Sequence, residues 1–269
     1  MTPTFGPGNA PPDKSGAAGL DGWFQTPPGQ YALDWERARF DAALADVFGY
    51  QALQVGLPAL DALAANRMPH RWLALPGAPH APPLPARAAL AADSTALPFA
   101  EASLDLVALP HTLECSADPH ATLREVQRVL VHEGRVAITG LNPASLWGLR
   151  RWRHLGGDRR WPPAGGECIG HRRLRDWLRL LEFELESMAF GCYRPAVRGE
   201  GALTRFRWMD SMGQRWWPIF GAVYFMLAVK RTRGARLVGP AWKATPAVAG
   251  APAPVANRAT TEKKPIEPH

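Results

Sequence analysis

The placement of proline is the feature of this 269-residue sequence that most limits its fold. The chain has 27 prolines, about twice the usual share of roughly 5%. A proline inside a helix removes a hydrogen bond and clashes with the preceding turn. Three segments, residues 1–30, 76–98 and 240–269, each hold six of these prolines. Long helices and strands are therefore expected between these segments, and not within them.

The two ends of the chain are also rich in Gly, Ala and Thr and poor in large apolar side chains. A segment of this composition cannot bury enough apolar surface to offset the entropy lost on ordering. We therefore predict disordered tails over residues 1–30 and 238–269. The folded domain is predicted over residues 31–237.

Several sequence features bear on the compartment of the protein. No basic start with a following apolar run precedes the first Gly/Pro-rich stretch, so a secretory signal is not expected. The longest apolar run, residues 219–229, is shorter than the ~20 residues of a membrane-spanning helix. Cys115, Cys168 and Cys192 are too few and too widely spaced to indicate a disulfide framework or a zinc site. These observations predict a cytoplasmic protein without a metal.

Apolar periodicity within the predicted domain alternates between short strands and amphipathic helices. Strands are expected at residues 52–55, 71–75, 88–92, 104–109, 135–139, 183–190 and 220–230, and helices at 34–48, 59–66, 119–130 and 171–181. Such alternation is typical of an α/β fold, in which helices cover both faces of a mostly parallel sheet.

Positive charge is concentrated in one part of the chain. The formal net charge is +7, and residues 148–179 alone hold nine arginines against three acidic residues, a net charge of +6. Trp147, Trp152, Trp161 and Trp177 are interleaved with these arginines. Such a segment attracts anionic partners and offers stacking surfaces. The plainer interpretation is a solvated surface with a basic loop over residues 148–170.

A series of short motifs runs through residues 92–143. In chain order they are Ala92-Asp-Ser-Thr-Ala-Leu-Pro-Phe99, Ser103-Leu-Asp-Leu-Val107, His111-Thr-Leu-Glu114, Asp118-Pro119, Leu123-Arg-Glu125, Arg128-Val-Leu130, Gly134-Arg135 and Thr139–Pro143. In order and spacing this series resembles the class I S-adenosylmethionine-dependent methyltransferases of the type 11 kind. The resemblance implies a Rossmann-like, seven-stranded, mostly parallel sheet with an antiparallel last strand, for which residues 219–229 are the candidate.

Three further stretches resemble an uncharacterised bacterial subgroup of methyltransferase-like proteins. They are Gly49-Tyr-Gln-Ala-Leu-Gln-Val-Gly-Leu-Pro58, Ser145-Leu-Trp-Gly-Leu-Arg150 and Gly191-Cys-Tyr-Arg-Pro195. The resemblance as a whole covers the chain from about Asp34 to Lys230. It implies a bacterial methyltransferase, although it does not imply a particular methyl acceptor.

The resemblance also implies a cofactor site for S-adenosylmethionine. Ligands of open α/β sheets bind at the carboxyl ends of the strands, where Gly56 and Leu57 would face the methionine part of the cofactor. Asp93 would accept a hydrogen bond from the adenine amino group, and the backbone N–H of Ser94 would meet a ring nitrogen. Asp93 could instead cap a turn.

The acceptor side of the site is expected at the ends of the next two strands. Pro110 and His111 would lie near the cofactor sulfonium, and His111 and Glu114 are the candidate catalytic residues. Asn142 is expected at the place where the substrate enters. Arg150, Arg151 and Arg153 belong to the basic segment, which the family often uses as a substrate lid, and their charge would favour an acidic substrate.

Two positions depart from the family pattern. The first loop of the family has several glycines after an acid, whereas this chain reads Gln54-Val-Gly-Leu-Pro-Ala59. The second strand of the family ends on an acid that binds the ribose, whereas this strand ends Leu75-Pro-Gly77. Two hypotheses follow. The chain is a methyltransferase with an unusual cofactor site, or it is an inactive methyltransferase fold that binds nucleic acid or another polyanion through residues 148–179. An NAD-linked enzyme is not expected, because no G-x-G-x-x-G follows a strand.

Overall fold

The computed structural model describes residues 20, 22–76, 88–152, 168–196 and 200–231, all within the compact unit that spans residues 1–233. Most of both predicted tails, and the basic loop from residue 153 to residue 167, lie outside the described residues. Within the described part of the chain, no helix is long and apolar enough to cross a membrane.

Seven strands form one sheet in the order β3-β2-β1-β4-β5-β7-β6. In chain order the strands are β1 (Gln51–Val55), β2 (His70–Leu75), β3 (Ala88–Ala91), β4 (Leu104–Pro110), β5 (Leu130–Leu141), β6 (Phe183–Gly191) and β7 (Val223–Lys230). β1 to β5 pair in parallel, and β7 lies antiparallel between β5 and β6. This arrangement confirms the predicted fold class, including the antiparallel last strand.

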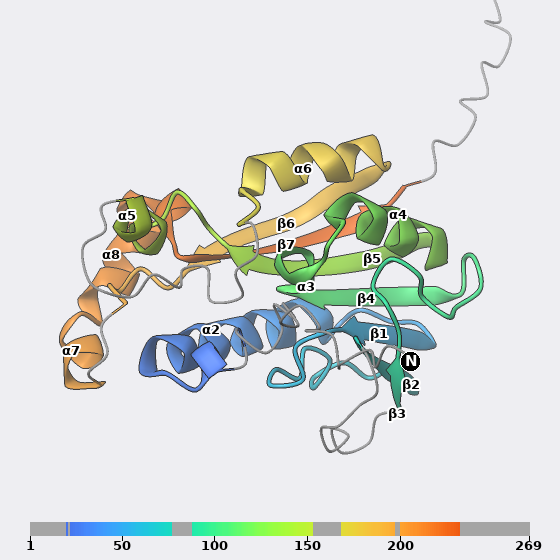
Figure 1. The fold of residues 1–269 in the computed structure, drawn as a ribbon, viewed down its shortest axis with the longest axis horizontal. Coiled ribbons are helices and arrows are strands. Elements are labelled where there is room, and N and C mark those ends of the chain that lie inside the picture. The colour runs from blue at the N-terminus through green and yellow to red at the C-terminus, as the bar shows by residue number, and fades with distance from the viewer. Residues whose placement is uncertain (1–19, 21, 77–87, 153–167, 197–199, 232–269) are drawn as a thin grey trace, which may run out of the picture. The chain divides into compact units, whose positions relative to one another are not determined.

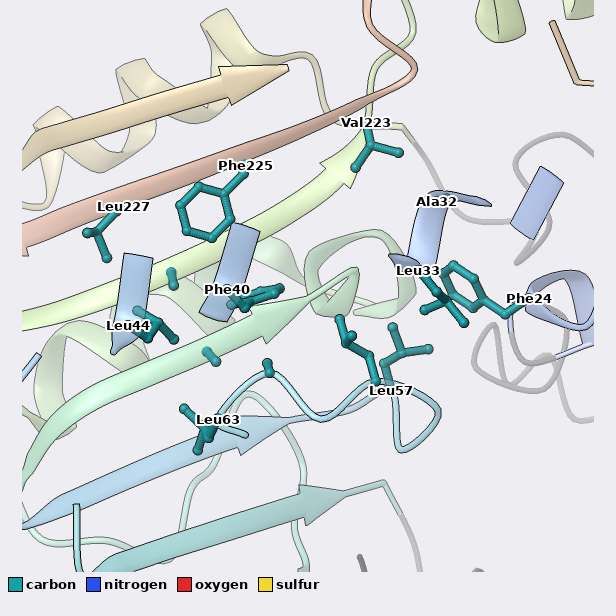
Figure 2. Packing of buried hydrophobic residues seen from close by; sticks show 14 of the residues in the cluster. Phe24, Ala32, Leu33, Phe40, Leu44, Leu57, Leu63, Val223, Phe225 and Leu227 are labelled. Atoms are coloured by element: carbon teal, nitrogen blue, oxygen red, sulfur yellow. The ribbon is translucent and has the colours of Figure 1, made fainter. Parts of the chain in front are cut away.

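Helices cover both faces of the sheet (Figure 1). On one face lie α4 (Pro119–Val129) and α6 (His171–Leu180), whose apolar side chains pack on Val107, Val136 and Met226 of the sheet. On the other face α2 (Pro27–Leu44) packs against β7, where the rings of Phe40 and Phe225 meet edge to face at 5.3 Å. Figure 2 shows Phe40 and Leu44 beside Phe225 and Leu227 in this second core.

Shorter helices gather where the strands end. They are α3 (Thr112–Cys115), α5 (Leu146–Trp152), α7 (Glu200–Arg205), α8 (Trp208–Trp216) and the 3-10 helix η1 (Pro218–Phe220). α3 follows β4 directly. Figure 1 shows α5 and α8 together beyond the end of β5.

Helix α2 corrects two predictions. It begins at Pro27 and not at Asp34, with Thr26 as its N-cap, and Leu20 and Phe24 before it are buried. The predicted domain boundary at residue 31 is therefore too late. The predicted helix end at Phe48 was also wrong, because the helix ends at Leu44 and Phe48 is 77% exposed. The stripe that is buried contains Ala32, Leu33, Glu36, Phe40 and Leu44, since large side chains decide which face turns inward.

Two further predicted elements differ in the structure. Residues 59–66 form turns and not the predicted helix. The last strand begins at Val223, whereas Ile219 and Phe220 belong to η1 and its surface and are 41% and 46% exposed. The fully buried strand predicted over residues 219–229 is therefore shorter than the apolar run that suggested it. An apolar run indicates burial only where the chain continues as a strand.

Candidate cofactor site

A cavity of about 630 Å³ opens at the carboxyl ends of β1, β2 and β4. This is where the strand order reverses, between β1 and β4, and where ligands of open α/β sheets bind. The predicted cofactor residues all line it: Gly56, Leu57, Asp93, Ser94, Pro110 and His111. Three segments that are separate in the sequence, at residues 56–57, 93–94 and 110–111, thus meet in one hollow.

The turn after β1 is held by the side chain of Gln54, which is fully buried. Its amide nitrogen lies 3.2, 3.0 and 2.6 Å from the carbonyl oxygens of Gly56, Leu57 and Leu60. Its amide oxygen accepts a hydrogen bond from the backbone N–H of Ala62 at 2.9 Å. An amide can both donate and accept, whereas a carboxylate only accepts. Gln54, which stands where the family has an acid, can therefore make all of these hydrogen bonds, whereas an ionised acid could not donate to the carbonyl oxygens of the turn.

Two consecutive residues of this turn have left-handed backbone conformations. Gly56 has a φ of 76°, which glycine adopts without strain, and Leu57 has a φ of 42°. The side chain of Leu57 is only 7% exposed and belongs to the core beside Phe24 and Leu33 (Figure 2). Most of the Leu57 side chain is therefore packed in the core, although part of it still contributes to the cavity wall.

Asp93 lies exposed at the rim of the cavity, after β3. Its Oδ1 atom accepts hydrogen bonds from the backbone N–H and the hydroxyl of Thr95, both at 2.8 Å. These two hydrogen bonds lower the pKa of the carboxyl group. Asp93 therefore caps its own turn, as the alternative interpretation had it, and the same contacts keep its carboxylate ionised and fixed at the rim.

Hydroxyl groups line the cavity next to Asp93. The hydroxyl of Thr122 lies 3.0 Å from that of Ser94 and 2.8 Å from that of Ser116. Leu75, whose carbonyl accepts a hydrogen bond from Ala92 at 3.0 Å, and Pro76 stand where the family has its ribose-binding acid. Among the described residues that line the cavity, the carboxylates belong to Asp93 and Asp118 alone.

His111 forms the inner end of the cavity wall and is buried between two carboxylates. Its backbone is left-handed, with a φ of 52°, and its ring is fully buried. Nδ1 lies 2.7 Å from Oε2 of Glu114, and Nε2 lies 2.6 Å from Oε1 of Glu36. Burial alone would lower the pKa of His111, but the charges of Glu36 and Glu114 raise it to about 10. Both ring nitrogens thus face carboxylate oxygens, an arrangement that favours the protonated imidazolium.

The two carboxylates connect this histidine to other parts of the sheet. Glu114 accepts a hydrogen bond from the backbone N–H of Leu141 at 2.5 Å, at the end of β5. Glu36 accepts a longer one from the hydroxyl of Thr139 at 3.4 Å. The cluster of Glu36, His111 and Glu114 thus joins α2 to the ends of β4 and β5. A group with both nitrogens committed holds structure and has no lone pair with which to take a proton.

Asn142, the residue predicted at the substrate entrance, does not line the cavity. Asn142 is buried, and its amide donates to the carbonyls of Ile219 at 2.8 Å and Gly221 at 2.9 Å, so it fastens η1 to the end of β5. Arg150 and Arg151 belong to α5, but their side chains are not among the described ones. Arg153 lies outside the described residues.

Glu36 was assigned no role from the sequence, because the helix was predicted to begin at Asp34 and not at Pro27. Once the helix begins at Pro27, Glu36 stands out as an acid among Ala32, Leu33 and Phe40. An acid in an apolar stripe indicates a buried partner. That signal was present in the sequence and required only the correct helix start.

Comparison with known proteins agrees with this architecture. A family model described as a methyltransferase domain matches residues 77–138. The uncharacterized protein YafS of Escherichia coli (strain K12) is 43% identical over 94 residues, which is 35% of this chain and 38% of that protein. The chain thus matches well under half of the length of this curated relative.

Solved structures share the fold at low sequence identity. A SAM-dependent methyltransferase of Thermotoga maritima is 14% identical, with a TM-score of 0.56 over 78% of this chain and 94% of that one. A SAM-dependent methyltransferase of Archaeoglobus fulgidus is 16% identical, with a TM-score of 0.51 over 74% and 94% of the two chains. At such identities the likeness concerns the fold alone.

The sheet topology gives the chain the fold of the class I S-adenosylmethionine-dependent methyltransferases, and the family match over residues 77–138 supports that assignment. S-adenosylmethionine is the cofactor that this family implies. The cavity suits a ligand of this kind, since its volume falls within the ~300–1,000 Å³ of small-molecule sites.

Proposed function

We propose that the chain transfers a methyl group from S-adenosylmethionine, bound in the cavity at the ends of β1, β2 and β4, to an acceptor. The observation that carries the proposal is the convergence of six predicted residues on that one cavity. When bound, the cofactor supplies an electrophilic methyl group on a sulfonium. The contribution of the protein is then chiefly positioning and alignment.

In this proposal Asp93 and Ser94 hold the adenine. The carboxylate of Asp93 is ionised and oriented by Thr95, so it is a preformed acceptor for an amino group. The chain lacks a carboxylate at the end of β2, which removes a charge-assisted contact of roughly 1.5–3 kcal/mol. We therefore expect weaker cofactor binding than a site with both acids would have.

The cluster around His111 would compensate in part for that loss. The carboxyl groups of Glu36 and Glu114 lie on the two sides of His111, behind the cavity wall. A buried negative charge favours a nearby cation, and the sulfonium is a cation. His111 is thus proposed as a positioning residue, which sets the turn after β4, and not as a proton acceptor.

The acceptor remains open. The acidic substrate expected from residues 148–179, the bacterial origin and the cytoplasmic location stay predictions. The alternative, an inactive fold that binds nucleic acid or another polyanion, is not favoured by the match to a methyltransferase domain.

Calorimetric titration of the full chain with S-adenosylmethionine and S-adenosylhomocysteine tests the proposal. We expect binding at micromolar to sub-millimolar ligand, weakened about ten- to a hundredfold by Asp93→Ala. The matched control is Asp34→Ala, which removes an exposed acid of α2 that pairs with Arg37. No heat at millimolar ligand, or equal binding by the two variants, would contradict the proposal.

A further inference from the structure

Large apolar side chains are exposed mainly in one region, beyond the end of β5. Of the twelve exposed large hydrophobic residues in the described part of the chain, eight lie on α5, α8, η1 and the residue between the last two. The six from α8 to η1 are Trp208, Met212, Trp216, Trp217, Ile219 and Phe220, and the two from α5 are Leu146 and Leu149. We call these eight the tryptophan face. Trp216 is its most exposed member, at 69%.

The inner side of α8 is firmly packed, so the exposure of its outer side is a property of the fold. Gly213 lies so close to Tyr193 that an added Cβ would come within 2.3 Å of the ring. Asp210 pairs with Arg194 at 2.8 Å and also accepts a hydrogen bond from Tyr31. Trp208, Met212 and Trp216 follow one another at steps of four residues and form the outer stripe of this helix.

A hollow of about 650 Å³ lies in the tryptophan face, between α5 and the residues around η1. Leu149, Met209 and Phe220 are among the side chains that line it. The hydroxyls in its wall are already used, since Ser145 donates to the carbonyl of Asn142 and Tyr193 to that of Pro218, both at 2.7 Å. The hollow therefore suits an apolar group and offers little to orient a polar one.

Cationic side chains border the face. Arg205, Arg207 and Arg215 are exposed on or beside α7 and α8. The nearby acid Asp210 is engaged by Arg194. By sequence, α5 leads into the segment 148–179, whose net charge is +6. Any partner of this face thus meets apolar surface and positive charge together.

We propose that the tryptophan face docks on the surface of an anionic lipid bilayer. Tryptophan and aliphatic side chains beside arginine are the combination that holds interfacial helices at a membrane surface. Acyl chains would fill the apolar hollow, and anionic headgroups would meet the arginines. Nucleic acid has no aliphatic part for the hollow, and a second copy would bring like charges together. The inference concerns attachment and is independent of methyl transfer.

Vesicle flotation with the full chain tests this docking. One set of vesicles is pure phosphatidylcholine, and the other contains about a third phosphatidylglycerol, an anionic lipid. We expect partitioning to the anionic vesicles, with a blue shift of tryptophan emission, and a decline at high salt. The double variant Trp216→Ala/Phe220→Ala should partition at least about tenfold less. Arg215→Glu should reduce partitioning at least about fivefold, and only to anionic vesicles.

Matched controls separate this face from general hydrophobicity. Phe48→Ala and Leu180→Ala remove side chains that are 77% and 81% exposed elsewhere on the chain, and both should partition as the parent does. Circular dichroism confirms that each variant is folded, and Trp208→Ala/Met212→Ala serves as a second pair. The proposal is overturned if neither vesicle binds the chain, or if control and face variants lose binding equally. Self-association or nucleic-acid binding that these variants abolish, without vesicle binding, overturns it as well.

Discussion

Two hollows at the same edge of the sheet differ in what lines them. The cavity over β1, β2 and β4 is bounded by left-handed turns, an ionised aspartate and a string of hydroxyls. The hollow beyond β5 is lined mostly by aliphatic and aromatic side chains. The first has its polar groups fixed by internal hydrogen bonds, whereas the second has its hydroxyls engaged and its apolar groups exposed. The fold thus prepares one hollow for a polar ligand and the other for an apolar surface.

The buried cluster of Glu36, His111 and Glu114 forms part of the wall of the first hollow. His111 lines the cofactor cavity, while Glu114 reaches the backbone of Leu141, next to the residues that border the apolar hollow. A buried charged cluster is stable only while each member keeps its partners. We therefore expect substitutions in this cluster to change the free energy of unfolding most, and substitutions on the outer side of α8 to change it least.

Glu36→Ala should have the largest effect. It leaves Nε2 of His111 without its acceptor inside the core, and breaking a buried ion pair by removing one partner costs about 3–5 kcal/mol. Urea denaturation measures the loss of unfolding free energy. Asp34→Ala, on the exposed side of the same helix, is the control and should change it by less than about 1 kcal/mol. Similar losses of unfolding free energy in the two variants would show that the buried cluster does not stabilise the fold.

Gln54→Glu should come next, with a loss of about 2–4 kcal/mol. The substitution restores the acid that the family usually has, but it places an acceptor against the three carbonyl oxygens that now receive the amide. Thermal and urea unfolding measure the change, and Gln25→Glu, at an exposed position, is the control. A stabilised Gln54→Glu protein with tighter cofactor binding would refute the role given to this amide.

The same two residues mark how far the sequence alone could lead. The motif series correctly predicted the sheet and its antiparallel strand, because those depend on the order of the strands. Asp93 and His111 line one cavity, and their roles toward a cofactor stay predictions. The motif series could not show that Gln54 supports the turn, since that depends on four contacts with residues up to eight positions away. Glu36 and His111 lie 75 residues apart, and their pairing follows from how α2 packs on the sheet.

Stability should also fall with rising pH, at most about 1.4 kcal/mol for each pH unit. The carboxylates of Glu36 and Glu114 outweigh the effect of burial and raise the pKa of His111 from 6.5 to about 10. A raised pKa in the folded state means that the contribution is complete below pH 6.5 and lost as the pH approaches about 10. Unfolding at a series of pH values measures the slope.

Nitrogen NMR of the imidazole rings tests the same assignment directly. At pH 8 the ring of His111 should be protonated on both nitrogens. His171 is the internal control, because partial burial and the charges of Arg172 and Arg175 lower its pKa, so that it should be neutral at that pH. A neutral His111 ring at pH 8 would contradict the raised pKa and the charged cluster behind the cofactor cavity.

The smallest effect is expected on the outer side of α8. Trp216→Ala removes a side chain that is 69% exposed, so the unfolding free energy should change by no more than about 0.5 kcal/mol. Gly213→Ala, three residues earlier on the inner side, adds a single carbon against the ring of Tyr193 and should cost about 1–3 kcal/mol. Both are measured by thermal unfolding without lipid. A large loss in Trp216→Ala would mean that this tryptophan stabilises the fold, and the outer side of α8 would then be part of the core and not a surface prepared for a partner.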